Sequence, residues 1–186
     1  MYHPALPTLV LVSGKPGAGK STLARQLAAE GALWLPLVAC DPLRNGIRTT
    51  MAGHGDTAAL RPGKEAIDLF YDTIAFLLDR KVSLIAELSL RRGLDEANVS
   101  SLLSQCRIRN VHCVVESAVA QQRFLARRSA RGTAGAASPI VTAMREDAFD
   151  WSIFAPLDLP LPRLLIDTTA GYAPPLEEII VFCRQQ

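Results

Sequence analysis

The 186-residue sequence has no long apolar run, no paired cysteines and little lysine, and these absences narrow the classes of protein to consider. No stretch approaches the roughly 20 apolar residues that a membrane-spanning helix needs. The first seven residues, MYHPALP, contain two prolines and lack the basic region of a secretory signal. We therefore expect no membrane partner and a cytoplasmic location.

The cysteines are too few and too scattered to build a framework. No CxxC motif is present, so neither a zinc site nor a set of disulfides is indicated, and a reducing compartment is expected. The length suits one domain over residues 1–186, and the hydrophobic fraction of 49% is ordinary for a globular protein. The four cysteines are Cys40, Cys106, Cys113 and Cys183.

The positive charge is unevenly placed and consists mostly of arginine. Residues 89–131 hold eight arginines against three acidic residues, although the net charge of the chain is only +2. A balance this small does not favour coating of a long nucleic acid. Because the planar guanidinium suits bidentate phosphate contacts, the basic region is either a phosphate-binding face or a solvated helix face.

Apolar, β-branched runs alternate with helical patterns along the chain. This order predicts an α/β domain in which a parallel sheet is covered by helices on both faces. Strands are expected at 8–13, 34–40, 82–90, 110–117 and 162–169. Helices are expected at 20–31, 41–51, 63–81, 94–107, 118–131, 139–150 and 175–185, with loops at 52–56 and 132–138.

The segment GKPGAGKS, Gly14 to Ser21, matches the pattern G-x-x-x-x-G-K-[ST] at every constrained position. Its glycines let backbone N–H groups turn towards an anion, and the following helix directs its positive end to the same place. Lys20 would reach the β- and γ-phosphates, and the Ser21 hydroxyl would bind Mg²⁺. We predict a triphosphate site formed by Gly14, Lys15, Pro16, Gly17, Ala18, Gly19, Lys20, Ser21 and Thr22.

This motif excludes one alternative and leaves others open. A dinucleotide fingerprint starting at Gly17 would need a third glycine where Thr22 stands. The motif does not choose between ATP and GTP, or between hydrolysis and transfer of the phosphate.

Asp41 follows the expected second strand, at the edge where a parallel sheet faces its ligand crevice. Its carboxylate could accept a proton from an attacking hydroxyl, and Arg44, one helical turn later, could hold an anionic group. An Asp-Pro pair is equally an ordinary helix start, with Asp41 as N-cap and Pro42 at the first position. Spacing alone leaves both interpretations open.

Three features together resemble the small P-loop kinases: GKPGAGKSTLA at 14–24, DPLR at 41–44, and Arg123-x-x-x-Arg127. This group includes predicted ATP-binding kinases, 5′-hydroxyl polynucleotide kinases, chloramphenicol phosphotransferase and zeta-toxin kinases. The resemblance implies a three-layer P-loop NTPase domain with five parallel strands in the order 2-3-1-4-5. It also implies a mobile arginine lid at about 123–138, Asp41 as the base and Arg44 as the residue that grips the acceptor.

The resemblance also implies roles for residues later in the chain. An acidic residue at the end of the third strand, here Glu87 where most members have aspartate, would hold Mg²⁺ through water. Its alternative is a bond to a neighbouring backbone group or arginine. Arg127 matches the lid position that closes on the transferring phosphate, and Arg123 would contact the nucleotide. Arg123, Arg127 and Arg131 share one helix face, which is alternatively a plain basic surface.

Other polar residues carry weaker expectations. Arg91 and Arg92 either contact an anionic acceptor or are solvated, and His112 is expected to be structural. His54, in the 52–56 loop, lies near the expected acceptor site. Residues 167–169 end the fifth strand, where kinases of this type often contact the base.

These features predict an ATP-dependent kinase that moves the γ-phosphate of Mg·ATP to a hydroxyl. The acceptor is a small molecule, a 5′-hydroxyl nucleic-acid end or an activated sugar. The alternative is a nucleotide-gated binding module or ATPase switch without a phosphorylated product. No protein partner is indicated. The expected catalytic residues are Lys20, Asp41, Arg44 and Arg127.

Overall fold

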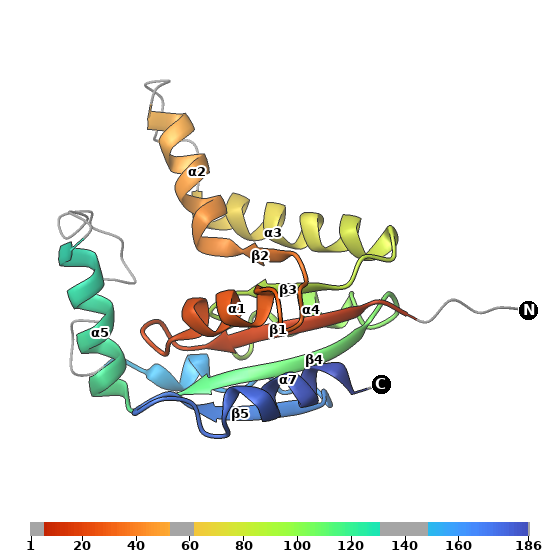
Figure 1. Cartoon of the computed structure of the whole chain (residues 1–186). Coiled ribbons are helices and arrows are strands. Elements are labelled where there is room, and N and C mark those ends of the chain that lie inside the picture. Colours follow the sequence, from red (N-terminus) through yellow and green to blue (C-terminus); the bar gives the residue numbers. More distant parts are fainter. Residues whose placement is uncertain (1–5, 53–61, 131–148, 186) are drawn as a thin grey trace, which may run out of the picture.

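Five parallel strands form one sheet in the order β2-β3-β1-β4-β5, as predicted (Figure 1). The computed structural model describes residues 6–52, 62–130 and 149–185. The strands are β1 (Thr8–Gly14), β2 (Leu37–Ala39), β3 (Leu84–Glu87), β4 (Arg107–Val114) and β5 (Arg163–Asp167).

Strand β1 is central and is therefore apolar on both faces. It pairs with β3 from Leu9 to Val12 and with β4 along its full length. Leu9 and Leu11 pack into the core on one face, whereas Val10 and Val12 pack into the core on the other. This placement explains why the first strand is a continuous apolar run and not an alternating pattern.

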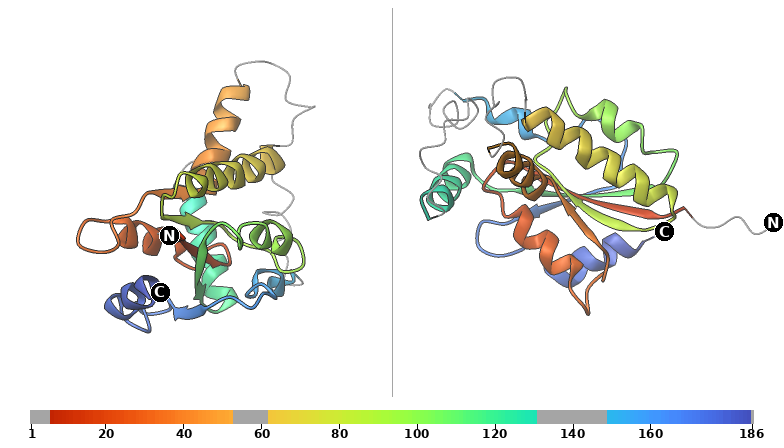
Figure 2. Two further views of the ribbon diagram at one scale, coloured as in Figure 1. Left: turned by 90° about the vertical axis from the view of Figure 1, so that its right-hand side faces the viewer. Right: turned by 90° about the horizontal axis from the view of Figure 1, so that it is seen from above.

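Helices cover both faces of the sheet, which makes a three-layer molecule (Figure 2). The α3 helix (Pro62–Asp79) and the short α4 helix (Glu96–Ser100) lie on one face. The α1 helix (Lys20–Ala28) and α7 (Leu176–Arg184) lie on the other. The 3-10 helix η1 (Trp151–Phe154) lies on the α3 side and accepts a hydrogen bond from the backbone N–H of Arg92.

Two helices start at the carboxyl edge of the sheet and extend away from it. These are α2 (Cys40–Ala52), which follows β2, and α5 (Ser117–Ala130), which follows β4. In Figure 1 they rise on either side of the end of β1. The chain between β1 and α1 therefore lies between them, at the edge where parallel α/β sheets bind ligands.

The structure differs from the sequence prediction mainly at element boundaries. Strand β2 has only three residues, because Trp34 adopts a φ of 53° and Pro36 has no N–H to donate. The following helix begins at Cys40, so the prediction of Asp41 as an N-cap is wrong: Asp41 lies inside the first turn. The predicted helix at 94–107 is mostly turns after Ser100, and β4 begins at Arg107.

Several predictions fall outside the described residues. These are His54, Arg131, the loop at 132–138, and nearly all of the expected loop at 52–56 and helix at 139–150. Among the helices of the described ranges, none is both long and apolar enough to cross a membrane.

Candidate active site

The P-loop, Gly14 to Ser21, connects β1 to α1 and is packed closely from two sides. Gly14 and Gly17 have φ values of 132° and 89°, a region that favours glycine. A Cβ on Gly17 would overlap the Ala120 carbonyl of α5, and one on Gly14 would overlap the Cys113 carbonyl of β4. Glycine is therefore required at both positions for two reasons: the backbone conformation, and the neighbouring carbonyl that leaves no room for a Cβ.

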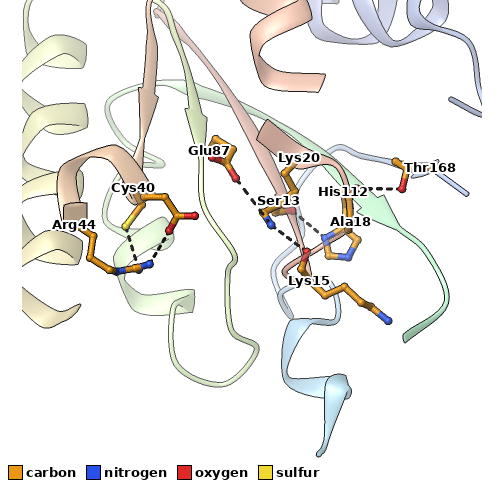
Figure 3. A network of polar contacts seen from close by, with 10 residues as sticks. Ser13, Lys15, Ala18, Lys20, Cys40, Arg44, Glu87, His112 and Thr168 are labelled. Carbon is orange, nitrogen blue, oxygen red and sulfur yellow. Dashed lines mark hydrogen bonds and ion pairs between the residues drawn. The ribbon is translucent and has the colours of Figure 1, made fainter. Parts of the chain in front are cut away.

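Side chains from distant segments hold the P-loop in place. The Thr168 hydroxyl, just after β5, lies 3.1 Å from the Ala18 carbonyl oxygen, to which it donates, and 3.2 Å from that of Val114. On the other side, the Lys15 ammonium donates to the Ser117 hydroxyl at 2.9 Å. Thr168, Ala18 and Lys15 are labelled in Figure 3. The loop is thus tied to β5 and to α5.

Lys20 and Glu87 form a buried ion pair at the P-loop. The Lys20 Nζ donates to the Lys15 carbonyl at 3.0 Å and lies 3.9 Å from Glu87 Oε1 (Figure 3). Burial lowers the pKa of Lys20 and raises the pKa of Glu87, and the charge of each partner opposes the shift of the other. The pair joins the start of α1 to the end of β3.

Three other predicted residues lie close enough to act on this pair. Hydrogen bonding by the Ser21 side chain and the charge of Arg127 lower the pKa of Glu87, whereas Asp41 raises it. Asp41 and Arg127 also act on Lys20, where Asp41 raises the pKa and Arg127 lowers it. The structure therefore gathers residues from β3, α1, α2 and α5 at one edge of the sheet.

Asp41 and Arg44 form an ion pair on the first turn of α2. Arg44 Nη1 lies 2.6 Å from Asp41 Oδ1, and the Asp41 side chain is 69% exposed. The other end of the Arg44 guanidinium lies 3.6 Å from the Cys40 sulfur. Burial raises the pKa of the Cys40 thiol to about 11, and the Arg44 charge opposes this. The Asp41 carboxylate is thus accessible and held by the arginine one turn away.

Arg123, which the sequence suggested as a nucleotide contact, binds backbone in this structure. Its guanidinium donates to the carbonyl oxygens of Thr168 at 3.0 Å and Thr169 at 2.8 Å. It therefore joins α5 to the loop after β5. Because Thr168 also holds Ala18, one chain of contacts links α5, this loop and the P-loop.

A buried polar network on the α3 side of the sheet was missed by the sequence reasoning. Ser13 Oγ lies 2.9 Å from His112 Nδ1 and accepts a hydrogen bond from Asn110 at 2.8 Å. Arg163 Nε donates to the side-chain oxygen Oδ1 of Asn110 at 3.3 Å. Burial, followed by the charges of Arg163 and Lys20, lowers the pKa of His112 to about 4, so this histidine is neutral. Its expected structural role agrees with these contacts. The available signal was two polar residues, Asn110 and His112, at a spacing of two on an otherwise apolar strand.

The fold and this edge define a class of protein. A strand, a glycine-rich loop and a helix on a parallel sheet of this order form a P-loop kinase-like domain. A family model described as "AAA domain" matches residues 9–147, and the chain belongs to this family.

Solved structures agree with this assignment. A candidate kinase from Chloroflexus aurantiacus J-10-fl is similar at 31% identity and a TM-score of 0.74, over 98% of this chain and 97% of that chain. The APS kinase of Mycobacterium tuberculosis, solved with AMPPNP and APS, is 20% identical with a TM-score of 0.56, over 98% and 100% of the two chains.

A gluconokinase from Sinorhizobium meliloti 1021 is 17% identical with a TM-score of 0.51, over 96% and 89% of the two chains. At identities this low, the likeness to APS kinase and gluconokinase shows the fold alone. No curated protein matches the sequence.

Proposed function

We propose that this protein is an ATP-dependent kinase that transfers the γ-phosphate of Mg·ATP to a hydroxyl group of an acceptor. The observation that carries the proposal is the buried Lys20–Glu87 pair, on which Asp41 and Arg127 both act. A nucleotide-binding loop and a candidate base thus adjoin at one edge of the sheet. The family assignment and the kinase-like fold support the proposal.

The P-loop provides the nucleotide half of the site. Its backbone N–H groups and the start of α1 would bind phosphate oxygens. Lys20 would exchange its bond to the Lys15 carbonyl for the β- and γ-phosphates. The Arg123 contacts to Thr168 and Thr169 would keep the loop after β5 in position beside the nucleotide base.

The residues present fit a magnesium ion. The Ser21 hydroxyl and the Glu87 carboxylate supply oxygen, the donor that Mg²⁺ prefers, and the ion commonly completes its shell with waters and phosphates. Within the described residues, no three His, Cys, Asp or Glu side chains gather as a protein-only metal site. Bound Mg²⁺ would neutralise phosphate charge.

Asp41 and Arg127 provide the transfer half of the site. The exposed Asp41 carboxylate would accept the proton of the acceptor hydroxyl. The hydroxyl oxygen would bond to the γ-phosphorus while the bond from that phosphorus to the β–γ bridging oxygen breaks, and ADP would leave. Arg44 would hold this carboxylate and contact the acceptor. Arg127, on a lid at about 123–138 of a single domain over 1–186, would stabilise charge on the transferring group.

An acceptor screen with γ-labelled ATP tests the proposal. The panel contains neutral and anionic small alcohols, sugars and oligonucleotides with 5′-hydroxyl ends, and Lys20→Ala serves as the blank. A kinase moves the label to at least one acceptor. Release of labelled inorganic phosphate alone, at the same rate with every compound, would instead identify an ATPase switch. An oligonucleotide acceptor is recognised by a steep loss of affinity with added salt.

A further inference from the structure

The two arginines that follow β3 differ sharply in their surroundings. Arg91 binds Asp95 through its backbone N–H at 2.6 Å and through Nε and Nη2 at 3.4 and 3.3 Å. Asp95 is only 2% exposed, so it fixes the plane of the Arg91 guanidinium. The Arg92 side chain is exposed, and its backbone N–H donates to the Ile153 carbonyl. Of the two side chains, that of Arg91 is held by a buried carboxylate.

Tyr71, on α3, carries a buried hydroxyl that has no hydrogen-bond partner within the described chain. A buried hydroxyl without a partner is costly, so such a group calls for an explanation. Burial raises its pKa, the charges of Asp95 and Cys40 raise it further, and Arg91 opposes them. Tyr71 also packs against the buried cluster that contains Cys40, at the start of α2, and Leu90, the residue before Arg91.

Cys40 connects these groups to the transfer half of the site. The Arg44 guanidinium contacts its sulfur at 3.6 Å, and Asp41 follows it in the chain. The carboxylates of Asp41, Glu87 and Asp95 all raise the pKa of the Cys40 thiol. Cys40 thus joins the first turn of α2, which carries Asp41 and Arg44, to the buried cluster against which Tyr71 packs.

We propose that Tyr71 and Arg91 form an anion-binding subsite for the acceptor. The acceptor is therefore an alcohol that also carries a phosphate, sulfate or carboxylate group, a statement that rests on the kinase function proposed above. Tyr71 Oη and Arg91 Nη1 are the donors, because Nε and Nη2 of Arg91 face Asp95. A guanidinium already fixed by a buried carboxylate loses little freedom when it binds an anion.

The subsite is tested by titrating inorganic sulfate into the full chain saturated with Mg·AMPPNP, which occupies the P-loop. The chain has three tyrosines, so ¹³Cζ-tyrosine NMR resolves them, and Tyr71→Phe assigns the signal of Tyr71. We expect potassium sulfate to move the Tyr71 signal saturably, and potassium chloride at equal ionic strength to leave it in place.

Two neighbouring arginines give a matched pair of variants. Arg91→Gln should weaken sulfate binding about tenfold or more, the size expected for a lost charge-assisted hydrogen bond, whereas Arg92→Gln should change it by less than about twofold. Tyr71→Phe should weaken sulfate binding, detected by isothermal titration, without lowering the melting temperature. Equal effects of the two arginine variants would overturn the subsite. So would a Tyr71→Phe chain that melts earlier and still binds sulfate normally.

Failure of the subsite is distinguishable from failure of the proposed function. AMPPNP binding is measured first in the same samples, and its absence contradicts the kinase proposal alone. If AMPPNP does not bind, sulfate is titrated into the Lys20→Ala chain instead. Its P-loop lacks the phosphate-binding ammonium, so sulfate bound there is not mistaken for sulfate bound at the subsite. Among acceptors that become labelled in the screen, anionic alcohols should be preferred, and Arg91→Gln should raise their KM. A preferred acceptor without an anionic group would overturn the subsite.

Discussion

The Lys20 ammonium lies 3.9 Å from the Glu87 carboxylate, and both side chains are buried at the P-loop. The lysine expected to bind phosphate is therefore held by the carboxylate expected to face the metal ion. Each partner favours the charged form of the other against the effect of burial. Because each charge stabilises the other, removing either side chain should leave a buried unpaired charge and destabilise the fold.

Lys20→Met should make stability strongly dependent on pH. Without Lys20, the pKa of Glu87 rises further above its ordinary value, because the main charge that lowers it is gone. A carboxyl group with a raised folded-state pKa stabilises the fold at low pH, and this stability is lost as pH rises through that pKa. We expect the melting temperature of Lys20→Met to fall, relative to the native chain, as pH rises above the ordinary carboxyl pKa of 4.5.

The double variant Lys20→Met/Glu87→Gln is the control for this prediction. It removes the buried carboxylate as well, so the additional pH dependence should disappear. The single variant should lose about 3 kcal/mol of unfolding free energy at neutral pH, as expected for a broken buried pair, and the double variant less. Equal pH profiles for the single and double variants would show that Glu87 is not the titrating group.

Thr168→Val tests the attachment of the P-loop to β5. The substitution keeps the shape of the side chain but removes the hydroxyl that lies against the carbonyls of Ala18 and Val114. We expect a loss of about 1 to 2 kcal/mol in unfolding free energy, together with weaker AMPPNP binding. Thr169→Val, one residue later, is the control: its exposed side chain bonds the exposed Asp167 carboxylate and not the P-loop, so AMPPNP binding should not change.

Gly17→Ala tests the close approach of α5 to the P-loop. Gly17 and Gly31 have nearly the same φ, 89° and 90°, so alanine at either position carries similar backbone strain. Only at Gly17 would the new Cβ overlap a carbonyl, that of Ala120. Gly17→Ala should therefore destabilise the protein by about 1 to 3 kcal/mol more than Gly31→Ala in urea unfolding. Similar costs at the two sites would mean that α5 moves aside freely.

His112 should weaken the fold in acid. Its folded pKa is lowered from an ordinary 6.5 to about 4. The stability that this neutral histidine contributes is complete above about pH 6.5 and is lost as pH falls towards 4, by roughly 3 kcal/mol. His112→Gln should make the midpoint of urea unfolding less dependent on pH over this range. If the urea midpoint of the variant still falls with pH as steeply as that of the native chain, the titrating group is not His112.

The strands and the P-loop could be predicted because their signals are local. Apolar runs mark the strands, and the glycines with Lys20 stand within eight consecutive residues. The resemblance to a kinase group added the order of the strands, which the structure confirms. Boundaries were less accurate, because a single proline and the early start of α2 shorten β2 to three residues.

The contacts that complete the site could not be predicted from spacing. Thr168 reaches Ala18 across 150 positions, and Arg123 reaches Thr169 across 46, so only the folded chain brings them together. The difference between Arg91 and Arg92 likewise depends on Asp95 being buried. Tyr71 gave no signal, since an aromatic residue on an amphipathic helix is ordinarily core.

The central claim is that Asp41 accepts the proton of the acceptor hydroxyl during phosphate transfer. Single-turnover transfer of labelled γ-phosphate should be compared in the native chain and Asp41→Asn, with the dissociation constant for Mg·AMPPNP measured in both. The account predicts that transfer falls by about a hundredfold or more, while the dissociation constant changes by less than about twofold. Transfer at the native rate by Asp41→Asn would contradict it.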